Sequence, residues 1–242
     1  MTTIEQHYEN LLAPVYLWMA GGIEHALATG ASDIQGFATP NGLAVDLGAG
    51  FGMHAIPLAR HGWHVLAVDS SPLLLEHLRE QAQGLPVSIA LDDLRRFAAH
   101  LDAGCKADLV LCMGDTLTHM PDLDAVSALA QTVAQHLDPH GAFVLTFRDY
   151  SLLPQGPARF IPVRSDTHRI HTCLLEDAGD KVRVTDILHQ QADGQWRMTV
   201  SEYEKLRIAP ETLCSILRQS GFDVQCTDGP RGMVKVVASP AR

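Results

Sequence analysis

The stretch that decides the fold reads Val-Asp-Leu-Gly-Ala-Gly-Phe-Gly over residues 45–52. It continues an apolar run that begins at Leu43, and an amphipathic segment typical of a helix follows it over 53–61. A buried strand that ends in a glycine-rich loop before a helix is the first part of a βαβ unit, and the loop lets a ligand approach its backbone. The pattern therefore predicts a ligand site at the carboxyl edge of a parallel sheet.

Short apolar runs and helical segments continue to alternate as far as residue 150. Strands are predicted at 64–69, 87–91, 107–113 and 142–147, and helices from Ser71-Pro72 to Gly84 and over 123–137. A helix over 210–220 and two further strands repeat this style near the end of the chain. We therefore predict an α/β fold with a doubly wound, mostly parallel, seven-stranded sheet.

The region between these two parts has a different pattern. Residues 168–207 hold three extended runs separated by turn clusters, which is typical of an antiparallel meander. In the last run, Trp196, Met198 and Val200 alternate with polar residues, which predicts one packed face. The expected organisation is an α/β domain over 41–150 and 208–242, an inserted small antiparallel sheet over 151–207, and an N-terminal helical segment over 1–40 that covers the site.

The composition is that of a globular protein, with 46% hydrophobic and 19% charged residues in 242. A formal net charge of −10 argues against a nucleic-acid partner. The chain starts without a basic and apolar leader and has no apolar run long enough for a membrane span, so we expect a cytoplasmic protein. Five widely spaced cysteines fit reduced thiols. Two H-x-x-H pairs (His61 and His64, His168 and His171) lack further ligands nearby, so we expect no metal; a homo-oligomer is compatible with the sequence.

The ligand class follows from two carboxylates. Asp69 ends the second predicted strand, twenty-one residues after Gly48, where it can accept hydrogen bonds from a ribose. The glycine spacing is G-x-G-x-G rather than the dinucleotide pattern, and Asp46 stands two residues before the first glycine. A carboxylate there repels a pyrophosphate and stabilises an ammonium group. This favours an adenosine cofactor with a cationic amino-acid end; the alternatives are an NAD(P)-dependent oxidoreductase and a cofactor-binding protein without turnover.

Several segments in this order resemble the motifs of class I S-adenosylmethionine-dependent methyltransferases. They are VDLGAGFG (45–52), VLAVDSS (65–71), ALDDL (90–94), ADLVLCMGDTLTHM (107–120) and HLDPHGAFVLTF (136–147). The segment CMGDTLTHM with an inserted sheet is similar to the glycine and sarcosine N-methyltransferase branch, which usually has Asn where this chain has Asp115. The resemblance implies S-adenosylmethionine as cofactor and a small-molecule acceptor.

The resemblance also implies which residues contact the cofactor. The methionine end would lie against Gly48 and Gly50, the ribose on Asp69, and the adenine near Asp93, with Asp92 as the alternative. The full set is Tyr16, Asp46, Gly48, Gly50, Asp69, Ser70, Asp93, Leu94, Cys112 and Met113. Asp69 as a helix cap and Tyr16 as a core residue are the alternative interpretations.

Two further groups are candidates for the acceptor. Asp115 and His119 follow the fourth strand, where either can act as a base if it points into the pocket; a capping aspartate and a packed histidine are the alternatives. Residues 151–209 contain eight basic and eight acidic residues, unlike the acidic remainder. Four arginines in or beside this region predict an acidic or amino-acid-like acceptor, unless they lie on a solvated face: Arg148, Arg159, Arg164 and Arg169.

Overall fold

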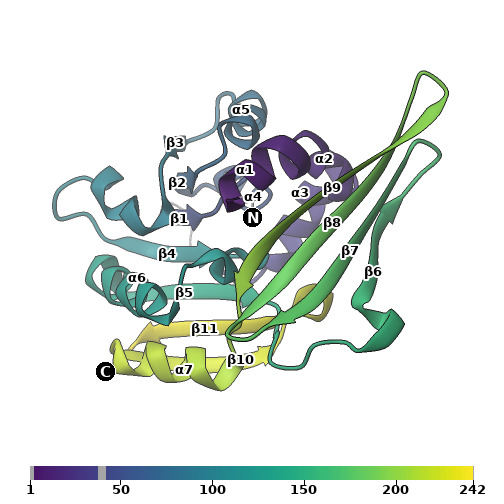
Figure 1. Cartoon of the computed structure of the whole chain (residues 1–242). Helices are drawn as coiled ribbons and strands as arrows, with labels where there is room; N and C mark the ends of the chain where they lie inside the picture. Colours follow the sequence, from purple (N-terminus) through teal and green to yellow (C-terminus); the bar gives the residue numbers. More distant parts are fainter. Residues whose placement is uncertain (1–2, 38–41, 242) are drawn as a thin grey trace.

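The glycine-rich loop follows an inner strand of a seven-stranded sheet, which Figure 1 shows. The computed structural model describes residues 3–37 and 42–241. The strand order is β10-β11-β5-β4-β1-β2-β3, and β11 alone among these strands runs antiparallel to its neighbours. The strands are β1 (Leu43–Leu47), β2 (His64–Asp69), β3 (Val87–Leu91), β4 (Ala107–Cys112), β5 (Leu137–Phe147), β10 (Phe222–Asp228) and β11 (Val234–Pro240). The predicted doubly wound α/β fold is confirmed.

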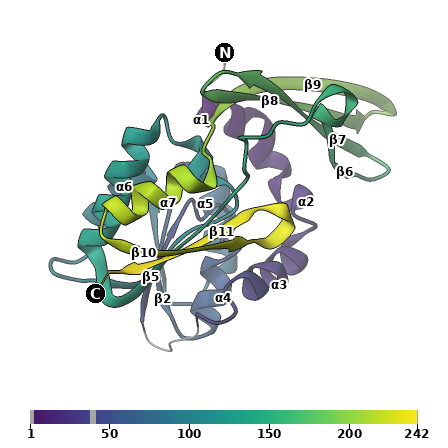
Figure 2. The same ribbon diagram turned by 90° about the horizontal axis from the view of Figure 1, so that it is seen from below.

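Helices cover both faces of this sheet, and Figure 2 shows α6 and α7 on one side and α3 and α4 on the other. Helix α5 packs on the same face as α3 and α4 through two buried leucines. The five helices are α3 (Ile23–Asp33), α4 (Ala55–Arg60), α5 (Pro72–Gln81), α6 (Leu123–His136) and α7 (Pro210–Gln219). Because the chain order reverses between β1 and β4, a crevice forms at the carboxyl ends of these two strands, where open α/β sheets bind ligands.

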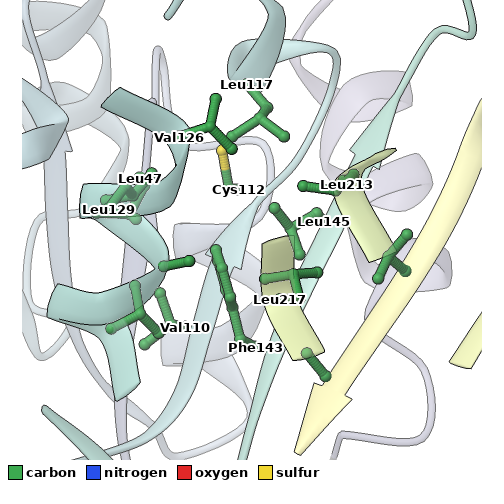
Figure 3. Packing of buried hydrophobic residues seen from close by; sticks show 14 of the residues in the cluster. Leu47, Val110, Cys112, Leu117, Val126, Leu129, Phe143, Leu145, Leu213 and Leu217 are labelled. Atoms are coloured by element: carbon green, nitrogen blue, oxygen red, sulfur yellow. The ribbon is translucent and has the colours of Figure 1, made fainter. Parts of the chain in front are cut away.

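The larger core lies between the sheet and α6 and α7 (Figure 3). Cys112 at the end of β4 points into it beside Leu117 and Val126 and is fully buried. Burial, together with the charges of Asp46 and Asp115, raises the pKa of the Cys112 thiol well above its ordinary value. The thiol is therefore a packing group without nucleophilic character.

A second, antiparallel sheet extends from the domain in the order β6-β7-β8-β9 (Figure 1). Its strands are β6 (Phe160–Ser165), β7 (Arg169–Ala178), β8 (Lys181–Ala192) and β9 (Gln195–Leu206). The meander was predicted, but β6 was not: it is short, contains a proline and is offset by a register shift. The packed face predicted for the start of β9 is wrong, because Trp196, Met198 and Val200 are 49%, 63% and 50% exposed. This part of β9 extends beyond the elements that cover the rest of the sheet.

The N-terminal segment lies between the two sheets, with α1 beside the base of β9 (Figure 1). It runs through α1 (Ile4–His7), a π-helix (Tyr8–Leu12), a 3-10 turn (Ala13–Val15) and α2 (Tyr16–Met19). His7 is buried and bonds to Asp186 on β8 at 2.9 Å, and Leu12 packs against Leu188. Among the described residues, no single helix is long and apolar enough to cross a membrane. The N-terminal segments Ile4–Met19 and Ile23–Asp33 meet these criteria only when taken together, and they are bent by 80° relative to each other.

Candidate active site

A cavity of about 620 Å³ opens at the carboxyl ends of β1, β2 and β4. Its volume lies in the range usual for small-molecule sites. The sheet forms its floor, the N-terminal segment one wall, and the base of β8 and β9 part of its rim. The predicted residues on its lining are Tyr16, Gly48, Gly50, Asp69, Ser70, Asp93, Leu94, Met113 and His119.

The glycine-rich loop is held in a conformation that glycine favours. Gly48 and Gly50 have φ of +76° and +54°. A Cβ at Gly48 would lie 2.4 Å from the Thr116 side chain, so the loop and the segment after β4 meet in close contact. A Cβ at Gly50 would meet nothing nearer than 3.8 Å, which leaves the backbone there accessible to a ligand.

Asp69 ties this loop to the end of β2. Its Oδ2 accepts a hydrogen bond from the Gly50 amide at 2.7 Å, and its Oδ1 accepts one from the Ser71 amide at 2.8 Å. Burial raises the pKa of Asp69, and the backbone hydrogen bonds partly offset this effect. Each carboxylate oxygen has a further lone pair, so the group that fixes the loop can also accept hydrogen bonds from a ribose diol.

Asp46 lies beneath the loop and does not reach the cavity surface. It is 1% exposed, and its Oδ2 has no hydrogen-bond partner among the described residues. Burial raises the pKa of Asp46 to about 6. A buried carboxylate with one unsatisfied oxygen fits a cofactor that brings a cation to this loop, as the ammonium of S-adenosylmethionine would.

The adenine end of the predicted site contains Asp93 and Leu94. Asp93 caps the 3-10 helix Leu94–His100 by accepting from the Arg95 amide at 2.8 Å, and its carboxylate also binds the Arg95 guanidinium. Asp92 bonds instead to His100 at 2.9 Å and is absent from the cavity lining. Of the two neighbouring aspartates, Asp93 is the one that borders the cavity.

His119 and Tyr8 form a pair at the other end of the cavity. The Tyr8 hydroxyl lies 3.1 Å from His119 Nε2. Burial, assisted by the Lys205 ammonium, lowers the pKa of His119 to about 3, and burial raises the pKa of Tyr8 well above 10. Both groups are neutral at physiological pH, so the phenol can donate to a neutral imidazole. Tyr8 is an important lining residue that the sequence interpretation missed.

Asp115 is placed away from the cavity, in the left-handed region with φ of +78°. Its carboxylate accepts hydrogen bonds from the Arg148 amide and the Tyr150 hydroxyl, both at 2.9 Å, and from the Lys205 ammonium. Burial acts to raise the pKa of Asp115, but Lys205 and these hydrogen bonds hold it below its ordinary value. The geometry gives no support for Asp115 as a base, because its oxygens are already engaged.

The four arginines predicted to bind the acceptor do not line the cavity. The guanidinium groups of Arg164 and Arg169 lie 5.9 and 5.6 Å from the centre of the Trp18 ring. These cation–π contacts connect α2 to the antiparallel sheet β6–β9, called the outer sheet below. Arg159 pairs with Glu176 at 3.3 Å, and the Arg148 side chain is exposed. The base of the outer sheet contributes Lys181 and Glu204 to the lining instead.

Three of the four H-x-x-H histidines have structural partners: His171, His61, and His168, whose Nδ1 lies 3.1 Å from Gln191 Oε1. His171 is buried and bonds to Asp186 at 2.8 Å, on the same carboxylate that holds His7. His61 bonds to the Pro57 carbonyl at 2.7 Å. Cys112 lies in the core rather than on the cavity lining, whereas Met113 reaches the lining.

The doubly wound sheet with an antiparallel last pair, the G-x-G-x-G loop and the acidic end of β2 define a nucleoside-cofactor fold of the methyltransferase type. Residues 44–141 match the family model described as a methyltransferase domain. This match confirms the resemblance to the class I S-adenosylmethionine-dependent methyltransferases, whose cofactor is S-adenosylmethionine.

Two relatives and one solved structure illustrate this similarity. Glycine N-methyltransferase of Rattus norvegicus is 26% identical over 211 residues, which is 79% of this chain and 72% of that protein. Glycine/sarcosine N-methyltransferase of Parasynechococcus marenigrum is 28% identical over 113 residues, 46% of this chain and 40% of that protein. A SAM-bound amino pentose methyltransferase from Micromonospora echinaspora shares the fold, with a TM-score of 0.74, 19% identity and coverage of 94% and 96% of the two chains.

Proposed function

We propose that the chain transfers the methyl group of S-adenosylmethionine to the amine nitrogen of a small, amino-acid-like acceptor. The observation that carries this proposal is the neutral Tyr8 and His119 pair, which lines the same cavity as Met113. In this fold the segment after the fourth strand borders the reacting group, and His119 comes from that segment.

When bound, the cofactor supplies an electrophilic methyl carbon on a sulfonium. The acceptor nitrogen forms the new bond to this carbon as the carbon–sulfur bond breaks, the bonding pair stays on sulfur as a thioether, and the nitrogen then loses its proton to water. An in-line displacement of this kind depends mainly on the position of an unprotonated nucleophile.

Tyr8 is suited to hold such a nucleophile. When its hydroxyl donates to His119 Nε2, the lone pairs of the phenol oxygen can accept a hydrogen bond from an amine N–H. An imidazole with a pKa of about 3 is too weak a base to remove a proton at neutral pH. His119 therefore acts in this proposal by orienting the Tyr8 hydroxyl.

Two observations support an amino-acid-like acceptor. The relative from Rattus norvegicus is named as a glycine N-methyltransferase, and that from Parasynechococcus marenigrum as a glycine/sarcosine N-methyltransferase. The cavity rim also offers both signs of charge, with the Lys181 ammonium for a carboxylate and Glu5 and Glu204 for an amine. Lys181 thus takes the role that the sequence interpretation gave to the four arginines.

A methyl-release assay with three matched sets of compounds tests the proposal: amino acids, their amides without the carboxylate, and hydroxy acids without the amine. We expect turnover with the amino acids, weaker turnover with the amides and none with the hydroxy acids. The variant Tyr8→Phe should lower kcat at least tenfold without changing cofactor affinity, whereas Tyr150→Phe, outside the cavity lining, serves as the matched control. Cofactor binding without methyl transfer to any amine would contradict the proposal.

A further inference from the structure

His54 occupies a special position next to the glycine-rich loop. It lies immediately before α4, lines the cavity and is only 6% exposed. Its Nε2 lies 3.2 Å from Asp33 Oδ2 on α3. A histidine that is buried against a carboxylate and still borders a ligand cavity is placed to act on the ligand as well as on the fold.

Asp33 is held from a second side by the C-terminal hairpin. Arg231, in the turn between β10 and β11, bonds to Asp33 Oδ1 at 3.2 Å and to Oδ2 at 2.8 Å. Burial acts to raise the pKa of Asp33, but the hydrogen bonds from His54 and Arg231 outweigh it and keep the carboxyl ionised. Asp33 on α3 and Arg231 in the C-terminal hairpin, which lie far apart in sequence, therefore fix the orientation of the His54 imidazole together.

The chemistry of the methionine end indicates what this imidazole meets. An amino acid carries its ammonium and its carboxylate on the same carbon, so their two partners in a protein must be close neighbours. His54 is near enough to the buried carboxylate of Asp46 to lower its pKa electrostatically. If Asp46 attracts the ammonium, His54 is the neighbouring group of the lining that can bind the carboxylate.

The other basic residues of the lining serve other parts of the cavity. Arg95 is bound to Asp93 at the adenine end, and Lys181 belongs to the outer sheet. His119 is neutral and lies at the acceptor end. Tyr16, which the family resemblance places near the cofactor carboxylate, also lines the cavity and can add a neutral hydroxyl donor.

We propose that His54, held by Asp33 and Arg231, binds the carboxylate of the cofactor's methionine end as an imidazolium, with its Nε2–H on Asp33 and its Nδ1–H on the cofactor. This inference rests on the proposed cofactor and concerns the part of the cofactor that takes no part in bond breaking. Arg231 is a positioning residue here, since it acts through Asp33 and does not line the cavity.

The test is a calorimetric comparison of two ligands, S-adenosylmethionine and decarboxylated S-adenosylmethionine, which keeps the ammonium, the sulfonium and the adenosine. We expect His54→Gln to bind S-adenosylmethionine at least tenfold more weakly than the wild type while its affinity for the decarboxylated ligand is unchanged. Arg231→Gln should show a smaller loss, about threefold, for the same ligand only. His100→Gln is the matched control, because His100 also pairs with an aspartate but lies outside the lining.

If His54→Gln weakens the binding of both ligands equally, the substitution has only disturbed the loop. If the binding of both ligands is unchanged, His54 does not contact the carboxylate. Each of these results overturns the inference. If the wild type binds neither ligand, the proposed function fails first, and the inference falls with it. Tyr16→Phe measured in the same way separates the contribution of the hydroxyl from that of the imidazole.

Discussion

Replacement of Asp46 by Asn removes a buried carboxyl group whose Oδ2 has no hydrogen-bond partner among the described residues. Its pKa is raised by burial from 3.8 to about 6. The folded state thus binds its proton more tightly than the unfolded state, and stability is lost as the pH rises from about 4 to above 6. A difference of about 2.2 pKa units corresponds to about 3 kcal/mol at 1.36 kcal/mol per unit.

The assay is urea unfolding of the wild type and of Asp46→Asn between pH 4 and 7.5, without cofactor. The free energy of unfolding of the variant, relative to the wild type, should increase by about 2.5 kcal/mol across this interval, because at pH 4 the unfolded-state carboxyl is already partly ionised. Any pH-independent cost of the new amide cancels in that comparison, as do titrating groups that do not interact with Asp46. A difference between the two proteins that stays constant with pH would refute the argument that Asp46 is buried with an uncompensated charge.

Three further substitutions test the site and its supports. Asp69→Asn keeps an oxygen for the Gly50 amide but loses the negative charge. The cofactor affinity measured by calorimetry should therefore fall about tenfold, with little change in Tm. An unchanged affinity would leave Asp69 with a structural role only. Gly48→Ala should lower the free energy of unfolding by about 2 kcal/mol through strain and contact with Thr116, whereas Gly62→Ala, with an open surrounding, should cost about 1 kcal/mol; equal losses would contradict the close contact. Lys205→Met leaves Asp115 buried without its cation and should destabilise by about 3 kcal/mol in urea, and a loss below about 1 kcal/mol would show that the pair is dispensable.

The parts of this protein that could be predicted from sequence are those specified locally. The strand runs around Val45 and Val68 and the turn at Gly48 depend on neighbours a few residues away, so periodicity and glycine spacing were sufficient for the order of elements and for the cofactor end of the cavity. The start of β9 shows what sequence periodicity cannot predict. Trp196 belongs to an alternating strand, but alternation cannot tell whether another element covers its apolar face.

The acceptor end depends on contacts between distant segments. The separation between Tyr8 and His119 is 111 residues, and that between Lys205 and Asp115 is 90 residues. No local sequence pattern reveals that Lys205 forms an ion pair with the carboxylate of Asp115. The arginines near residue 164 are neighbours in sequence, but Trp18, whose ring lies close to two of their guanidinium groups, is far away in the chain.

The central claim is that the cavity at the carboxyl ends of β1, β2 and β4 is a site for S-adenosylmethionine. Its most direct test is a calorimetric titration of the wild-type chain with S-adenosylhomocysteine and, separately, with NAD. We predict saturable binding of S-adenosylhomocysteine with a Kd no weaker than about 100 μM, which corresponds to roughly 5.5 kcal/mol, and no saturable binding of NAD. Saturable binding of NAD without binding of S-adenosylhomocysteine would contradict the account.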